Sequence, residues 1–361
     1  MTRQNYSEKE SMNRILRDFQ GEPVPQDAPG TVPGELLSEN QALSDLTELL
    51  GGSLPNEAFA IPSAVADAIG SAGFVRGWGG GYNFFVDPNN ANASDSNTGR
   101  DASKPLATIQ QAITNARAMS GDTIFVLQND GWTYGSGLGN TITEAVIVTA
   151  DKPGLRILGA GAGSMGVNWT AGVTGTFCLT INAIDAVVQG FNYWGDPVDC
   201  HGILCHWDGV NTYGENAAIS NCTFADSIDI GIQLEYSWYA KINDCHFQEC
   251  DNYGIFVDPA GSGMSYGQIV GNYFNDCTIA MALDDCDNSL IKDNWIYNTD
   301  AQVTGSATNA GLNTGAGAYN MVADNYFSCL LVNWDDFNSA SATDAWINNH
   351  VINGNPTARP A

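Results

Sequence analysis

Three carboxylates occupy equivalent places in the sequence and could form a catalytic set. Glu235, Asp258 and Asp284 each directly follow a short apolar string. If these strings stack as strands of consecutive coils, neighbouring carboxylates lie about 5 Å apart and next-but-one pairs about 10 Å apart, which brackets the separations used by retaining and inverting glycosidases. Crowding also raises the pKa of one carboxylate, which supplies an acid beside a base. Aspartate is equally common in turns after strands, and we favour a solvated turn over a catalytic site.

Calcium binding is a third interpretation of the same region, because Ca²⁺ requires several oxygen ligands. The ligands would be four aspartates: Asp258, Asp284, Asp285 and Asp287. The histidines show no metal-binding spacing, since His201 and His206 would lie on opposite faces of a strand. We favour no metal or other cofactor and keep Ca²⁺ as the alternative.

Aromatic residues gather in the segments between apolar strings, at Trp207, Tyr213, Tyr236, Trp238, Tyr239 and Tyr266. Such rings could stack on sugars or pack against a neighbouring subunit. We favour the subunit contact, and a glycan contact is the alternative.

The elements that would position these side chains form a repeat. The repeat has six positions. The first is Ile or Val, the third is Gly, Asn or Asp, the fourth is usually Asn or Cys, and the sixth is a bulky apolar residue. The second and fifth positions can be any residue. The clear copies are Ile219 to Phe224, Ile242 to Phe247, Ile269 to Phe274, Ile291 to Ile296 and Val322 to Phe327, and looser copies are Val188 to Tyr193 and Ile347 to Ile352. They start 22 to 31 residues apart, which fits one coil of a parallel β-helix.

A second apolar string follows the first in most coils, so we expect two or three short strands per coil, stacked on the next coil. Asn272, Asn294 and Asn325 then recur at one place and could form an inward or turn-lining ladder of amides. Cys222 and Cys245 occupy the same place in their own coils.

The cysteine content, net charge and apolar runs of the chain indicate where the protein is made and which partners it excludes. The nine cysteines form no zinc-type pair, and we expect free thiols that fill the core, as in a protein made in a reducing cytosol. The hydrophilic start MTRQNYSEKES shows no signal peptide. A net charge of −27 repels nucleic acid and anionic lipid. No apolar run approaches the roughly 20 residues of a membrane span. We therefore exclude nucleic-acid binding and membrane insertion.

Residues 1–75 differ from the rest and are typical of an N-terminal arm. Two stretches show helical apolar spacing but are too short to make a core, so the arm would order against a neighbouring subunit or a larger assembly. The residues that we expect to attach it are Met12, Ile15, Leu16, Phe19, Leu46, Leu49 and Leu50.

Residues 82–126 carry the most specific motif of the chain. The pattern predicts a strand over Tyr82–Val86, an amphipathic helix over Pro105–Ala118 and a strand over Ile124–Leu127. This order resembles the start of right-handed β-helix proteins of the pectate-lyase-like superfamily, in which a short helix caps the open end of the core. The resemblance covers about residues 82–355.

This resemblance implies an all-β chain: a single-stranded right-handed parallel β-helix with a capping α-helix and a partly helical N-terminal arm. The expected parts are the arm (1–75), the start of the β-helix with its capping helix (76–130) and the β-helix proper (131–361).

The chain matches the catalytic motifs of this superfamily poorly. Pectate-lyase-type elimination typically uses an Arg or Lys base, but no arginine lies between residues 157 and 358, and Lys241 and Lys292 are the only lysines there. Polygalacturonase-like enzymes carry Asn-Thr-Asp before Asp-Asp. Here Asp284-Asp285 precedes Asn298-Thr299-Asp300, and the later Gly-His-Gly and Arg-Ile-Lys motifs are absent. We therefore favour a protein that is not an enzyme.

An acidic β-helix with free thiols and a helical arm resembles bacteriophage virion proteins of the decoration or tailspike type. The resemblance implies a homotrimer that is made in the host cytoplasm and attached to capsid or tail proteins at the virion surface. Because the last repeat is followed by only a few residues, we expect a non-catalytic decoration or short-spike protein. One alternative is a tailspike depolymerase, that is, a glycoside hydrolase that uses Glu235, Asp258 and Asp284. The other alternative is a glycan-binding module. Both would act on a bacterial surface polysaccharide.

Overall fold

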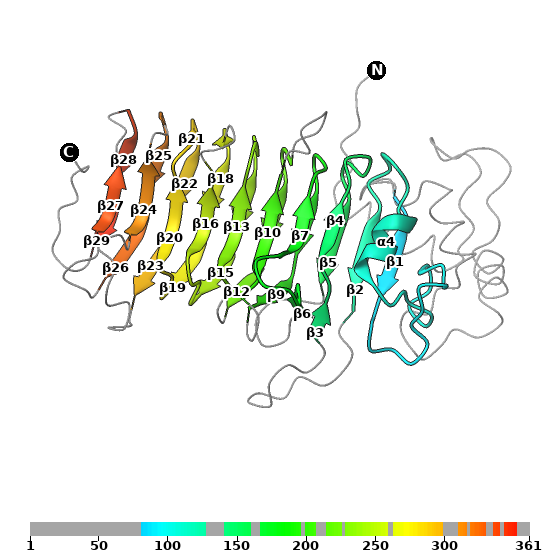
Figure 1. Ribbon diagram of the computed structural model, residues 1–361. Coiled ribbons are helices and arrows are strands. Elements are labelled where there is room, and N and C mark those ends of the chain that lie inside the picture. Colours follow the sequence, from blue (N-terminus) through cyan, green and yellow to red (C-terminus); the bar gives the residue numbers. More distant parts are fainter. Residues whose placement is uncertain are drawn as a thin grey trace, which may run out of the picture. The chain divides into compact units, whose positions relative to one another are not determined.

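The computed structural model describes residues 81–127, 141–159, 167–195, 199–206, 214–225, 228–258, 263–298, 310–315, 318–329, 335–339 and 343–351. All of them belong to one compact unit, Ile69–Ala361. The described strands pair in parallel in three long sheets and one two-stranded sheet (Figure 1). The predicted all-β parallel β-helix is confirmed.

The three long sheets are named A, B and C. Sheet A contains β1 (Asn83–Val86), β2 (Thr123–Val126), β5 (Arg156–Gly159), β8 (Val187–Gln189), β11 (Ala218–Ser220), β14 (Lys241–Asn243), β18 (Gln268–Val270), β22 (Leu290–Lys292), β25 (Met321–Ala323) and β28 (Ala345–Ile347). Sheet B contains β3 (Thr141–Thr143), β6 (Val167–Thr170), β9 (Phe191–Trp194), β12 (Thr223–Ala225), β15 (His246–Gln248), β19 (Tyr273–Asn275), β23 (Trp295–Asn298), β26 (Tyr326–Cys329) and β29 (His350–Val351).

Sheet C contains β4 (Val146–Val148), β7 (Phe177–Ile181), β10 (His201–Cys205), β13 (Ile230–Leu234), β16 (Tyr253–Val257), β20 (Ile279–Leu283), β24 (Ala310–Gly315) and β27 (Asp335–Ser339). The two-stranded sheet joins β17 (Met264–Ser265) to β21 (Cys286–Asp287). A regular coil therefore visits sheets A, B and C in turn, with three strands per coil. The first apolar string of the repeat is two strands in different sheets, and the second string is the strand of sheet C.

A single left-handed residue makes the corner between sheets A and B. It is the first residue after each strand of sheet A from β11 to β28, and its φ lies between 49° and 69° in the six corners formed by Asn221, Asp244, Gly271, Asp293, Asp324 and Asn348. Gly, Asn and Asp tolerate this conformation better than other residues. This explains why the third position of the repeat is restricted to these three residue types.

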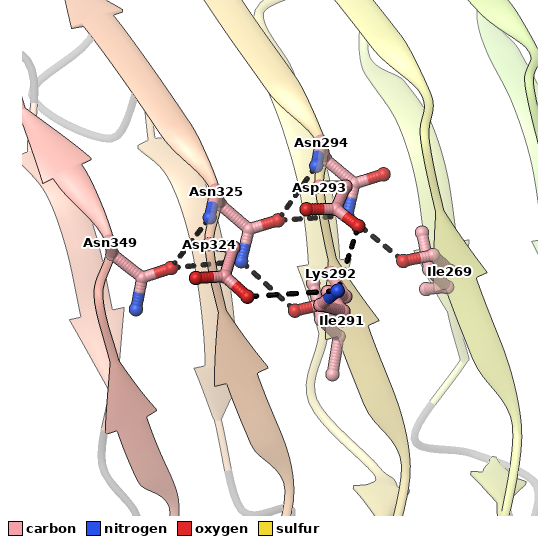
Figure 2. Close-up of polar contacts among 8 residues, drawn as sticks. All are labelled: Ile269, Ile291, Lys292, Asp293, Asn294, Asp324, Asn325 and Asn349. Atoms are coloured by element: carbon pink, nitrogen blue, oxygen red, sulfur yellow. Dashed lines mark hydrogen bonds and ion pairs between the residues drawn. The ribbon is translucent and has the colours of Figure 1, made fainter.

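The next residue turns inward and forms the predicted ladder. The side-chain amide of Asn294 donates to Asn325 Oδ1 (3.0 Å) and to the carbonyl oxygen of Ile269 (2.9 Å), and Asn294 Oδ1 accepts from Asn272 Nδ2 (3.0 Å). Asn325 repeats the contact with Asn349, as Figure 2 shows. The ladder side chains are buried with their polar groups paired, so the expectation of an amide ladder is confirmed.

Stacked rings fill the core on the inner side of sheet B. Tyr193, Phe224, Phe247 and Phe274 follow one another at centroid distances of 4.9, 4.8 and 4.7 Å with nearly parallel planes. All four are buried. A methyl group at Gly231 would lie 2.8 Å from the ring of Phe247, so glycine at this position of sheet C leaves room for the ring.

Eight cysteines in the described residues are buried and free, which confirms the expectation of core thiols for these eight: Cys178, Cys200, Cys205, Cys222, Cys245, Cys250, Cys277 and Cys286. Burial raises the pKa of Cys205 to about 12. A thiol of this kind stays protonated and packs as a small apolar group.

The capping helix is shorter than the predicted Pro105–Ala118. Helix α4 spans Ile109–Asn115 and packs against β1, β2 and β4. Leu106 instead bridges Val86 in extended conformation, and Thr108 caps the helix by accepting from Gln111 N at 3.1 Å. The predicted boundaries were wrong because the backbone of residue 106 is already used by this bridge. The five side chains expected to face inward are nevertheless buried: Leu106, Ile109, Ala112, Ile113 and Ala116.

Candidate functional site

The three predicted carboxylates form a column at the end of sheet C. Leu234, Val257 and Leu283 are in register across β13, β16 and β20. Glu235, Asp258 and Asp284 directly follow these residues. The expected alignment of the carboxylates therefore holds, and their catalytic role stays a prediction.

Two further side chains join this column. Gln233 Nε2 donates to Glu235 Oε1 at 2.8 Å and to Asp258 Oδ2 at 3.2 Å, which places these two carboxylate oxygens within about 6 Å of each other. His206 Nδ1 contacts Glu235 Oε2. His206 follows β10 at the place that Glu235 occupies after β13, because Cys205 is in register with Leu234. Extending the repeat one coil back would have found His206.

The remaining histidine of this strand takes a different partner. His201 Nδ1 lies 3.3 Å from Asp229 Oδ2, and its ring packs on Phe177. Burial lowers the pKa of His201, and the nearby Asp229 charge partly offsets this. His201 and His206 therefore belong to separate contacts.

Three aspartates of the calcium hypothesis, Asp284, Asp285 and Asp287, follow β20, and Asp258 follows β16 in the preceding coil. Asp287 Oδ1 accepts from the backbone N–H of Ala318 at 2.7 Å. Burial, with the nearby Asp287 charge, raises the pKa of Asp285. Within the part of the chain that the structure describes, no three His, Cys, Asp or Glu side chains are grouped to hold a metal ion. Calcium binding at Asp258, Asp284, Asp285 and Asp287 stays a prediction.

Two of the aromatic residues that were predicted to make contacts lie against each other in the structure. Tyr239 and Tyr266 stack at 5.6 Å in the turns that precede β14 and β18, and both are exposed with positive φ. Trp238 is exposed beside them, and Tyr236 is half-buried. Trp207, Tyr213 and all residues of the predicted arm lie outside the described residues.

Sequence reasoning missed a longer aromatic row on the outer face of sheet B. Its members, hereafter the outer aromatic row, are His246, Tyr273, Trp295, Tyr326 and His350. Consecutive ring centroids lie 4.9, 6.4, 4.4 and 5.4 Å apart. Each member directly follows a ladder residue, from Cys245 to Asn349. That shared position was the available signal.

The family described as "right handed beta helix region" matches residues 199–355, which include the ladder, the column and the outer aromatic row. This match agrees with the parallel β-helix fold that the structure shows for these coils. No curated protein sequence matches it.

Solved β-helix structures are similar at low identity. The Dettilon tailspike protein (gp208) has a TM-score of 0.41 and 13% identity, over 75% of this chain and 47% of the tailspike. A rhamnogalacturonan lyase has a TM-score of 0.49 and 15% identity, over 69% of this chain and 68% of the lyase. The alginate lyase from Paenibacillus sp. str. FPU-7 has a TM-score of 0.41 and 15% identity, over 68% and 92% of the two chains.

This chain thus spans about half the length of the tailspike. Among the helices of the described residues, none has the length and apolar character needed to cross a membrane.

Proposed function

We propose that this right-handed β-helix protein is a non-catalytic structural component of a bacteriophage surface, either a capsid decoration or a short spike. In this proposal it assembles as a homotrimer in the host cytoplasm, and residues 1–75 attach it to capsid or tail proteins. The observation that carries the proposal is the set of eight buried, free thiols inside the solenoid. Free thiols are typical of proteins folded in a reducing cytosol, and cell lysis would then release the particle.

The contacts of the carboxylate column support a role without catalysis. Gln233 and His206 occupy both side-chain oxygens of Glu235, and Gln233 also contacts Asp258. Glu235 and Asp258 thus have hydrogen-bond partners within the protein and need no substrate to satisfy them. The formal charge of −27 also keeps such a protein soluble at high copy number.

Disrupting the arm tests the attachment. In cells infected with the phage that encodes the chain, a tagged full-length chain should be incorporated into purified particles. Incorporation of the double variant Ile15→Asp and Leu16→Asp should be at least about tenfold lower, because a charge on side chains that are predicted to make an apolar docking contact opposes their burial.

Light scattering and circular dichroism provide the controls for this variant. Both chains should retain the mass of a trimer and the same β-sheet spectrum. Unchanged incorporation of the variant would refute attachment through the arm, and monomeric mass for the unmodified chain would refute the trimer.

A retaining glycoside hydrolase is the second candidate function. The shared contact with Gln233 favours it, because carboxylate oxygens within about 6 Å are closer to the separation of about 5–5.5 Å in retaining enzymes than to the wider spacing of inverting ones. If the column is catalytic, Glu235→Gln or Asp258→Asn should lower the turnover of polysaccharide from the host surface by about 10²–10⁴-fold.

Reducing-end release measures this turnover, and Asp151→Asn, at an exposed aspartate between β4 and β5, is the matched control. Equal turnover of all variants would exclude the column from catalysis. If the unmodified protein releases no reducing ends from the polysaccharide, the result would support the structural proposal.

A further inference from the structure

The outer aromatic row is part of a surface that repeats from coil to coil. Along each strand of sheet B, the row residue alternates with a buried core residue, as Tyr273 does with Phe274 and Trp295 with Ile296. Alternation along a strand places the row on the outer face. β15, β19, β23, β26 and β29 are consecutive neighbours in the sheet, so the row crosses five coils (Figure 1).

The rings are accessible in the middle of the row. Trp295 is 49% exposed and Tyr273 is 36% exposed. The Trp295 ring is tilted by 48° to Tyr273 and by 49° to Tyr326, so its neighbours do not cover it face to face. Exposed aromatic faces on a fixed strand lose little conformational entropy when they bind a ligand.

Hydrogen-bonding side chains run parallel to the row. Two residues further along each strand, Gln248, Asn275 and Tyr297 lie on the same face and are half-buried. Amides and a phenol can donate to and accept from hydroxyl groups. The surface therefore combines ring faces with neutral polar groups, at a spacing of one coil, about 4.8 Å.

Carboxylates border this surface on both sides. Asp244, Asp293 and Asp324 lie at the corner before it, and Glu249 and Asp276 follow its strands. Lys292 is the lysine nearest to the row in sequence, and it contacts Asp293 at 3.0 Å and Asp324 at 3.7 Å (Figure 2). Its charge is thus already matched by carboxylates of the protein.

We propose that the outer aromatic row binds a neutral polysaccharide whose chain runs along the β-helix axis. Sugar rings present apolar C–H faces that stack on the aromatic rings, and their hydroxyl groups meet the amides and the bordering carboxylates. The bordering carboxylates repel uronic-acid and phosphate polymers. Several weak contacts in a row add up for a polymer, because each bound sugar raises the local concentration of the next.

A second copy of the chain is the competing occupant of this face. The core of a protein interface is depleted of charged residues. Two copies joined here would bring carboxylates against carboxylates in a chain whose net charge is −27. The polysaccharide proposal does not depend on the virion role, and it concerns sheet B, whereas the carboxylate column lies on sheet C.

The test uses the full-length protein on immobilised bacterial surface polysaccharides, divided into neutral and anionic sets. The unmodified protein should bind at least one neutral polysaccharide and none of the anionic ones. Trp295→Ala and Trp295→Leu should each weaken that binding at least about tenfold, since leucine keeps an apolar side chain but removes the ring face. Tyr319→Ala, at an exposed aromatic residue outside the row, should bind as the unmodified protein does.

Light scattering on the same proteins separates the two occupants. An unchanged mass for Trp295→Ala with weakened binding supports the polysaccharide site. A reduced mass would overturn it in favour of a subunit interface. Binding to no neutral polysaccharide, or equal binding of all variants, would also overturn it. These results leave the arm-dependent attachment unaffected, so failure of one proposal is distinguishable from failure of the other.

Discussion

Replacing Asn294 with alanine should lower the free energy of unfolding by about 3–5 kcal/mol, because it leaves buried polar groups of two neighbouring coils without partners. Asn294 is 1% exposed. Its side chain accepts from the backbone and side chain of Asn272 and donates to Ile269 and Asn325. The loss should appear as a lower midpoint of guanidinium unfolding.

Asn275→Ala is the matched control for this prediction. Asn275 lies in the neighbouring coil, on the outer face of sheet B and half-buried. Its replacement should lower the free energy of unfolding by less than about 1 kcal/mol, as is usual for positions outside the core. Equal shifts for the two variants would show that the ladder contributes nothing beyond ordinary strand contacts.

Replacing Phe247 with alanine should cost about 3–5 kcal/mol of unfolding free energy through the cavity that it leaves. Phe247 is fully buried and is the middle ring between Phe224 and Phe274. Phe247→Leu should cost less than the alanine variant because it refills part of the volume. Thermal or guanidinium unfolding measures both variants.

Phe256→Ala is the control on the outside of the solenoid. Phe256 lies on β16, half-buried and stacked on Tyr253 at 4.6 Å. Its removal opens no cavity in the core and should cost clearly less than Phe247→Ala. A larger loss from Phe256→Ala would mean that the inner ring stack does not dominate the packing of these coils.

The ladder, the core thiols and the alignment of the carboxylates were predictable because each depends on residues that recur at one place in the coil. The outer aromatic row was missed although it recurs equally well. The sequence pattern did not divide the first apolar string between two sheets, whereas the string turns from sheet A to sheet B at a single left-handed residue such as Asp293. Recognising that corner assigns Trp295 to the outer face and Asn294 to the ladder.

Contacts between coils of unlike sequence were harder to anticipate. The pairing of His206 with Glu235 joins side chains of different type, so repetition of one residue type could not reveal it. The boundaries of α4 were missed for a related reason, since the bridge from Leu106 to Val86 is a tertiary contact that helical periodicity does not report.

The corner between sheets A and B also determines where the chain can change in length. Two residues separate the strands there in each of the six coils from β11–β12 to β28–β29, whereas the connections from sheet B to C and from C to A vary. An insertion at this corner would move a strand by one residue and turn its core side chains outward. We therefore expect insertions, natural or engineered, to be tolerated in the connections from sheet B to C and from sheet C to A. At the corner between sheets A and B, next to the ladder, the number of residues is expected to stay constant.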